Sequence, residues 1–206
     1  MPLPWIILGA AVAGAVVVRD ANSRIRRQDQ ERFRRPDPDP HEPDTAAERA
    51  AMARRPSDFV RTDIKVKPVP GAILCCGIYG LFEHTGIWLS EGLIVELHGS
   101  GLVRAVTPKR FLQNRTGSRI FIACDSTAHP LADEAFGERA RAGIFSVERY
   151  DPLANNCHRF SWRCISEQDE KLTTFKDFNV RLANWFKRRV YWDLCDLEER
   201  PWRQTS

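Results

Sequence analysis

The chain has 206 residues, enough for one ordinary domain with appendages, and its 43% hydrophobic content is sufficient for a packed core. A net charge of +4 is too small to indicate nucleic-acid binding. The six cysteines include no C-x-x-C pair, which argues against a structural zinc site. They are also too sparse for the disulfide framework of a small secreted protein. No motif indicates another cofactor.

The first predicted element is an apolar segment over residues 3–19. Leu3 to Val18 carries no charge, and Trp5 and Arg19 stand where interfacial residues would mark the two ends of a membrane span. We therefore expect a single transmembrane helix, although the segment is short for a hydrocarbon core of about 30 Å. A cleaved signal peptide and a buried helix remain alternatives; a signal peptide would carry positive charge before its apolar run.

The residues after the apolar run set its orientation. Seven arginines follow the run: Arg19, Arg24, Arg26, Arg27, Arg32, Arg34 and Arg35. The positive-inside rule places this side, with the rest of the chain, in the cytoplasm. Residues 20–60 are a polar linker, in which alternating proline and acid over residues 36–44 gives an extended spacer. The sequence thus predicts a single-pass membrane protein whose domain lies on the cytoplasmic side.

The domain is predicted to begin with strands. Residues 64–67 alternate as an edge strand does, and residues 72–79 follow as a second strand after a turn. Two further alternating runs, residues 83–89 and 93–99, flank a three-residue loop that ends in Gly92, which is free to take a left-handed conformation. This pattern predicts an antiparallel hairpin.

The simplest register of this hairpin brings two histidines together. It pairs Ile87 with Val95 on an apolar face and His84 with His98 on the more polar face. One imidazole could then take a proton from a cysteine, while the second holds the first in its correct tautomer. Glu96 is a fallback partner on the same face and is expected to be solvated. The alternative is that both histidines face solvent at the end of a sheet.

The following elements lead to a candidate nucleophile. The sequence predicts a short helix near residues 106–112, a strand over 119–123 and a helix over 131–141. The turn-forming residues 151–156 then lead into a helix that begins at or near Cys157. A thiol at a helix N-terminus is stabilised as the thiolate by the positive end of the helix dipole. The alternative is a buried cysteine that only packs in the core.

The last predicted segment, residues 169–206, is a tail with an amphipathic helix. Apolar side chains recur at spacings of three and four between Phe175 and Tyr191, and a basic run at residues 187–189 interrupts them. Such a helix could lie on an anionic membrane surface. The alternative is that its apolar stripe packs on the domain.

The chain contains three linked motifs: His84-Thr85-Gly86-Ile87-Trp88-Leu89, Glu96-Leu97-His98 and Asn156-Cys157-His158-Arg159-Phe160. They resemble the signatures of the lecithin retinol acyltransferase family, which belongs to the circularly permuted branch of the papain-like thiol hydrolases related to NlpC-type cell-wall peptidases. The resemblance covers residues 61–168. It implies an α+β fold, with a small antiparallel sheet and packed helices, in which Cys157 is the nucleophile, His84 the general base and His98 the orienting residue. It identifies no substrate-binding residue.

The chain departs from the pattern of that family at two positions beside the nucleophile. His158 stands where the family usually has glutamate, and Arg159 stands where it has histidine. Neither is one of the three catalytic groups that the resemblance implies. A positive Arg159 near the thiol would lower its pKa further.

The function we expect is a membrane-anchored thiol acyltransferase or hydrolase that forms an acyl-thioester on Cys157. An acyl lipid or phospholipid is the expected donor, by analogy with the family and because an anchored domain meets lipid at high effective concentration. A peptidase or amidase with the same chemistry is one alternative, and a non-catalytic, membrane-anchored interaction module is another. No feature of the sequence indicates an oligomeric state.

Overall fold

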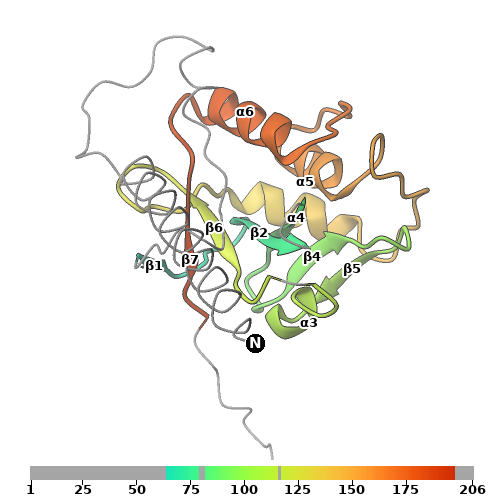
Figure 1. Cartoon of the computed structure of the whole chain (residues 1–206), viewed down its shortest axis with the longest axis horizontal. Helices are drawn as coiled ribbons and strands as arrows, with labels where there is room; N and C mark the ends of the chain where they lie inside the picture. The colour runs from blue at the N-terminus through green and yellow to red at the C-terminus, as the bar shows by residue number, and fades with distance from the viewer. Residues whose placement is uncertain (1–63, 79–81, 116, 198–206) are drawn as a thin grey trace, which may run out of the picture. The chain divides into compact units, whose positions relative to one another are not determined.

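A computed structural model of the protein describes residues 64–78, 82–115 and 117–197, which form an α+β fold as the sequence predicts (Figure 1). Seven strands make one sheet in the order β1-β7-β6-β2-β3-β4-β5, and all neighbours are antiparallel except β1 and β7. The strands are β1 (Lys65–Val66), β2 (Ile73–Ile78), β3 (Phe82–Trp88), β4 (Ile94–Leu97), β5 (Val103–Val106), β6 (Phe121–Cys124) and β7 (Tyr191–Cys195). The helices are α3 (Pro108–Phe111), α4 (Glu134–Ala142), α5 (Cys157–Ser166) and α6 (Phe175–Phe186).

The predicted transmembrane segment (residues 3–19) and the linker (residues 20–60) lie outside the described residues. Within the described ranges, no helix combines the length and the apolar character that crossing a membrane requires.

The hairpin of β3 and β4 has the predicted register. Ile87 lies opposite Val95 and Trp88 lies opposite Ile94. The connecting turn is closed by the N–H of Leu89, which donates to the carbonyl of Leu93 at 2.8 Å. This register assigns each side chain of β3 and β4 to one face of the sheet, because successive residues of a strand point to opposite faces.

Both faces of the sheet carry buried apolar side chains. On one face, side chains such as Ile87 and Val95 pack with α4, α5 and α6, which lie together on that side in Figure 1. On the other face, Leu74 and Ile94 pack with Phe111 of α3. Helix α5 contacts β3 and β4 directly, so its N-terminus is held against the hairpin.

Two strands were not predicted from the sequence. Strand β5 pairs along the whole of β4. Strand β7 lies between β1 and β6, in a stretch for which the sequence predicts the end of a helix. That helix, α6, ends at Phe186 because Lys187 adopts a left-handed conformation with φ 51°. The prediction of a helix as far as Tyr191 is therefore wrong.

The apolar stripe of α6 packs on the domain, which is the alternative that the sequence left open. Phe178 and Leu182 are fully buried in the same core as the helix that carries Cys157. From β7, the indole N–H of Trp192 donates to Asn179 Oδ1 at 2.7 Å, and its ring lies 5.2 Å from that of Phe175. Residues after 168 thus supply a helix and a strand to the fold.

Replacing Trp192 by alanine should destabilise the domain by about 3–5 kcal/mol, because the change leaves a cavity beside α6 and removes the only hydrogen bond that is described for Asn179 Oδ1. Chemical denaturation followed by circular dichroism measures the effect, with Trp192→Phe as the matched variant that keeps a ring and loses the N–H. An unchanged midpoint in Trp192→Ala would show that β7 lies outside the cooperative unit.

Candidate active site

Cys157 is the first residue of α5, as the sequence predicts. Asn156 caps this helix: its side-chain oxygen accepts the N–H groups of His158 at 3.0 Å and Arg159 at 3.1 Å. Its side-chain amide donates to the carbonyl of Leu172 at 2.9 Å, which ties the cap to the loop before α6. The thiol therefore lies at the positive end of a well-capped helix, and it is 4% exposed.

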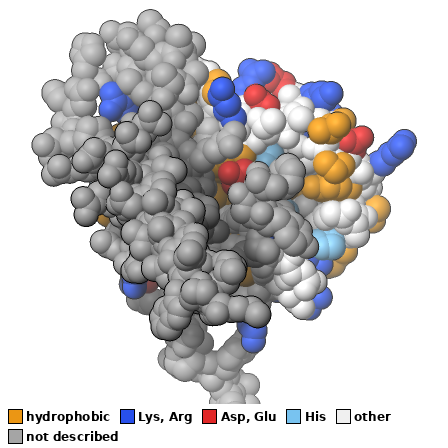
Figure 2. Space-filling view, viewed as in Figure 1, with side chains coloured by type: hydrophobic (Ala, Val, Ile, Leu, Met, Phe, Trp, Pro, Cys, Tyr) orange, Lys and Arg blue, Asp and Glu red, His pale blue; other side chains and the backbone are white. Residues whose placement is uncertain are grey.

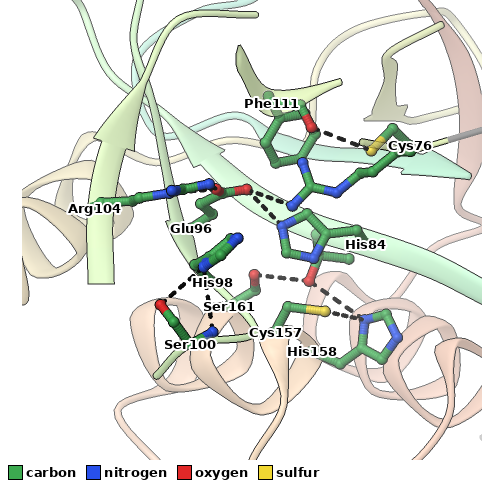
Figure 3. A network of polar contacts seen from close by, with 12 residues as sticks. Cys76, His84, Glu96, His98, Ser100, Arg104, Phe111, Cys157, His158 and Ser161 are labelled. Carbon is green, nitrogen blue, oxygen red and sulfur yellow. Dashed lines mark hydrogen bonds and ion pairs between the residues drawn. The ribbon is translucent and has the colours of Figure 1, made fainter. Parts of the chain in front are cut away.

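His84, on β3, lies against Cys157 (Figure 3). Its ring is buried, and its Nε2 is 2.7 Å from Glu96 Oε2. An ionised carboxylate can only accept, so Nε2 carries the proton and donates it to Glu96. The other ring nitrogen, Nδ1, is then left for proton exchange with Cys157, whose charge raises the pKa of His84.

The electrostatics of this pair favour its charged form. Burial raises the pKa of the Cys157 thiol, but interactions with His158 and His84 outweigh it and hold that pKa well below its usual range. Burial lowers the pKa of His84, but the charge of Cys157 and the hydrogen bond that Nε2–H donates to Glu96 outweigh burial and raise that pKa. A thiolate beside an imidazolium is the form that attacks carbonyl carbon.

Glu96 is buried, so the expectation that it is solvated is wrong. Besides His84, its carboxylate accepts from Arg104 Nε at 2.8 Å and from Arg115 Nη2 at 2.9 Å. Burial raises the pKa of Glu96, but the hydrogen bonds and charges of His84, Arg115 and Arg104 lower it to about 2. The sequence analysis did not predict the burial of Glu96 because it did not predict β5. That strand places Arg104 directly opposite Glu96.

His98, the predicted orienting residue, lies just beyond the end of β4. Its Nδ1 is 2.9 Å from the hydroxyl of Ser100 and accepts the N–H of Ser100 at 3.2 Å. Burial, followed by the charge of Arg104, lowers the pKa of His98. Among the described residues, no hydrogen bond joins His98 to His84. The structure brings Cys157 and His84 together and places Glu96, rather than His98, on the second nitrogen of His84.

His158 is a member of the site that the sequence analysis set aside. Its Nδ1 lies 3.9 Å from Cys157 Sγ and 3.3 Å from Thr85 Oγ1. Figure 3 shows the sulfur between the rings of His84 and His158. The signal in the sequence was the pair of adjacent residues Cys157 and His158, which a helix start turns toward the same buried region.

Arg159 does not act on the thiol as the sequence suggested. Its guanidinium donates to both carboxylate oxygens of Asp169, at 2.8 and 2.7 Å, and to the carbonyl of Ala154 at 2.7 Å. This ion pair braces the start of α5 against the loop that follows it. The groups that lower the pKa of Cys157 are the two histidines.

All six cysteines are buried and none forms a disulfide, but Cys157 differs from Cys164 and Cys195 in its electrostatics. Burial raises the pKa of Cys164 and of Cys195 to about 12. In the described part of the chain, no cluster of His, Cys, Asp and Glu side chains is arranged to hold a metal ion.

The wild-type chain should therefore react with iodoacetamide at Cys157 far below the pH at which an ordinary thiol reacts. The lowered pKa keeps the thiolate populated at pH values where an ordinary thiol is protonated, and the rate falls only when the pH drops through that lowered value. Cys164, on the same helix, should stay unmodified at neutral pH. Peptide mass spectrometry after timed alkylation measures both cysteines in one sample. A Cys157 midpoint near pH 8.5 would contradict the description of this site.

The chain was also compared with known proteins. It matches no known family model and no curated protein.

Proposed function

We propose that this protein is a thiol acyltransferase or hydrolase with Cys157 as nucleophile, His84 as general acid and base, and Glu96 as the orienting group. The observation that carries the proposal is the buried thiol of Cys157 at a helix N-terminus, with its pKa held low beside a histidine that bonds a buried carboxylate. Each part has the role that acyl transfer requires. A cysteine that only packed in the core, such as Cys164, would have a raised pKa.

In the proposed reaction, the thiolate of Cys157 attacks the carbonyl carbon of an ester or amide, and a carbon–sulfur bond forms. The tetrahedral intermediate then collapses, and the alcohol or amine leaves with the proton that His84 held on Nδ1. His84 next takes a proton from water or from an acceptor alcohol or amine, which attacks the thioester and restores the thiolate. Throughout, Glu96 accepts the Nε2–H of His84 and stabilises the imidazolium.

We infer that the donor is an acyl lipid, for which a phospholipid is the first choice. Three large hydrophobic side chains between α4 and α5 are exposed, in the segment that leads to Cys157: Phe145, Val147 and Leu153. Figure 2 shows hydrophobic side chains gathered beside Lys and Arg side chains on the face it presents. Such a surface suits contact with lipid.

The motif resemblance supports the same reading. We propose, on that resemblance, that the domain is a permuted papain-like thiol enzyme of the lecithin retinol acyltransferase type. We also propose that residues 3–19 anchor it as a single-pass protein with the domain on the cytoplasmic side, because the arginines follow the apolar run.

The proposal is tested by turnover of the full-length chain with phosphatidylcholine vesicles, in which lysophospholipid, free fatty acid and acylated acceptor are measured by mass spectrometry. Release of lysophospholipid by the wild type supports the lipid donor. Turnover of peptide or amide substrates alone would contradict the lipid and leave a peptidase or amidase. No turnover of any of these, together with an ordinary thiol pKa at Cys157, would contradict the enzyme and favour a non-catalytic interaction module.

A further inference from the structure

His158 occupies a buried place beside the sulfur that the proposed reaction does not yet use. The residue is 6% exposed. Its ring stacks on that of Phe178, with centroids 5.8 Å apart and planes at 23°, and lies 5.6 Å from the ring of Phe175. Both phenyl rings belong to α6, so the packing of that helix fixes the plane of the imidazole. A buried polar ring is costly unless its nitrogens have partners.

Nδ1 of His158 faces a short chain of polar groups. It lies 3.3 Å from the hydroxyl of Thr85, the residue next to His84 on β3. That hydroxyl in turn accepts the O–H of Ser161 at 3.0 Å, and both hydroxyl residues are fully buried. The same nitrogen is 3.9 Å from Cys157 Sγ. The position of Nδ1 at the sulfur is thus fixed from β3, α5 and α6 together.

We propose that His158 is a positioning residue for Cys157: its Nδ1–H donates to the thiolate and holds the sulfur toward the substrate, while His84 exchanges the proton. This inference rests on the proposed function. The two imidazoles differ in their other partners. Glu96 favours a protonated His84, whereas aromatic rings and a hydroxyl surround His158. The proton that moves during the reaction therefore belongs to His84.

The other ionisable groups around the sulfur lie on different elements from His158. His84 approaches from β3, Glu96 lies on β4, and His98 follows the end of that strand. Tyr150, in the segment before α5, has its pKa raised to about 12 by burial and by the charge of Cys157. Arg115 lies near enough to influence both His84 and Tyr150. The rings of α6 that contact His158 are the phenyl groups of Phe175 and Phe178, which do not ionise. Replacing His158 therefore removes one hydrogen-bond donor and leaves the other ionisable groups in place.

The test is the pH dependence of Cys157 alkylation by iodoacetamide in the full-length chain. His158→Phe keeps an aromatic ring of similar size and removes the donor, so the midpoint should rise by about 1 pH unit. The rate at pH values below the wild-type midpoint should fall about tenfold. His158→Gln keeps an N–H and should retain most of the wild-type behaviour. The matched control is His129→Gln, which changes an exposed histidine in another loop and should alter nothing.

If His158 had a purely structural role, its replacement would change the alkylation rate by the same factor at every pH and leave the midpoint in place. That result would overturn the role given to His158 and leave the proposed function standing. A wild-type midpoint near pH 8.5 would overturn the proposed function as well. Should His158→Phe not fold, nitrogen NMR of labelled histidine in the wild type decides. The Nδ1 signal of His158 should move when Cys157 is alkylated, and an unmoved signal would contradict the contact.

Discussion

Replacing Cys157 by serine is expected to abolish acyl transfer, with a loss of about 10⁴-fold or more in turnover. A serine hydroxyl is not ionised at neutral pH, so the stabilisation that the helix N-terminus and the two histidines give to a thiolate has no charge to act on. The fold should be retained, because serine differs from cysteine by one atom. Turnover of the acyl donor at saturating concentration measures the effect.

Cys164→Ser is the matched control for this change. Cys164 lies on the same helix and is equally buried, but burial raises its pKa to about 12. Its replacement by serine should lower stability, because a buried hydroxyl is left to find a partner, while turnover per folded molecule stays near that of the wild type. Equal loss of activity in both variants would mean that the effect comes from the packing of α5 and not from a nucleophile.

Glu96→Gln should have the second largest effect, with turnover lowered by about 10²–10⁴-fold. Glutamine can present its N–H₂ or its oxygen to His84, so the imidazole loses the fixed tautomer and the negative charge that favours its protonated form. The change also leaves Arg104 and Arg115 without their buried counter-charge, which should cost about 3 kcal/mol or more of stability.

His98→Gln separates the two candidates for the orienting group. His98 bonds Ser100 rather than His84, so its replacement should lower turnover only a few-fold. A loss in His98→Gln that equals or exceeds the loss in Glu96→Gln would contradict the role given to Glu96 and restore the role predicted for His98.

Stability at low pH provides an independent measure of Glu96. Its pKa is depressed from 4.5 to about 2 in the folded protein, so its contribution is fully present above pH 4.5 and is lost as the pH falls toward 2. The size of this contribution is about 3 kcal/mol. Denaturation midpoints of Glu96→Gln should fall less steeply than those of the wild type across that window. Parallel curves would contradict the depressed pKa.

The local pattern of the sequence was sufficient for the hairpin and for the start of α5. The alternating runs on either side of a three-residue loop that ends in Gly92 predicted the register in which Ile87 lies opposite Val95. The capping asparagine before Cys157 marked the helix start correctly. Both features depend on neighbours in the chain.

The features that the sequence missed depend on distant segments. The burial of Glu96 requires Arg104 on β5 and Arg115 after α3, and neither contact follows from the hairpin alone. The position of β7 between β1 and β6 is likewise set by tertiary pairing, which overrode a helical pattern that ran past Phe186. The plane of the His158 ring is likewise set by a distant segment, because Phe178 of α6 stacks on it.

The central claim is that Cys157 forms a covalent acyl intermediate. The most direct measurement is intact mass spectrometry of the full-length chain after brief incubation with an acyl-lipid donor and acid quench, followed by peptide mapping. The account predicts a mass increase equal to one acyl group, mapped to Cys157, removed by hydroxylamine and absent from Cys157→Ser. An acyl group on a residue other than Cys157 would contradict the account. Donor turnover with no adduct in either the wild type or Glu96→Gln would contradict it as well.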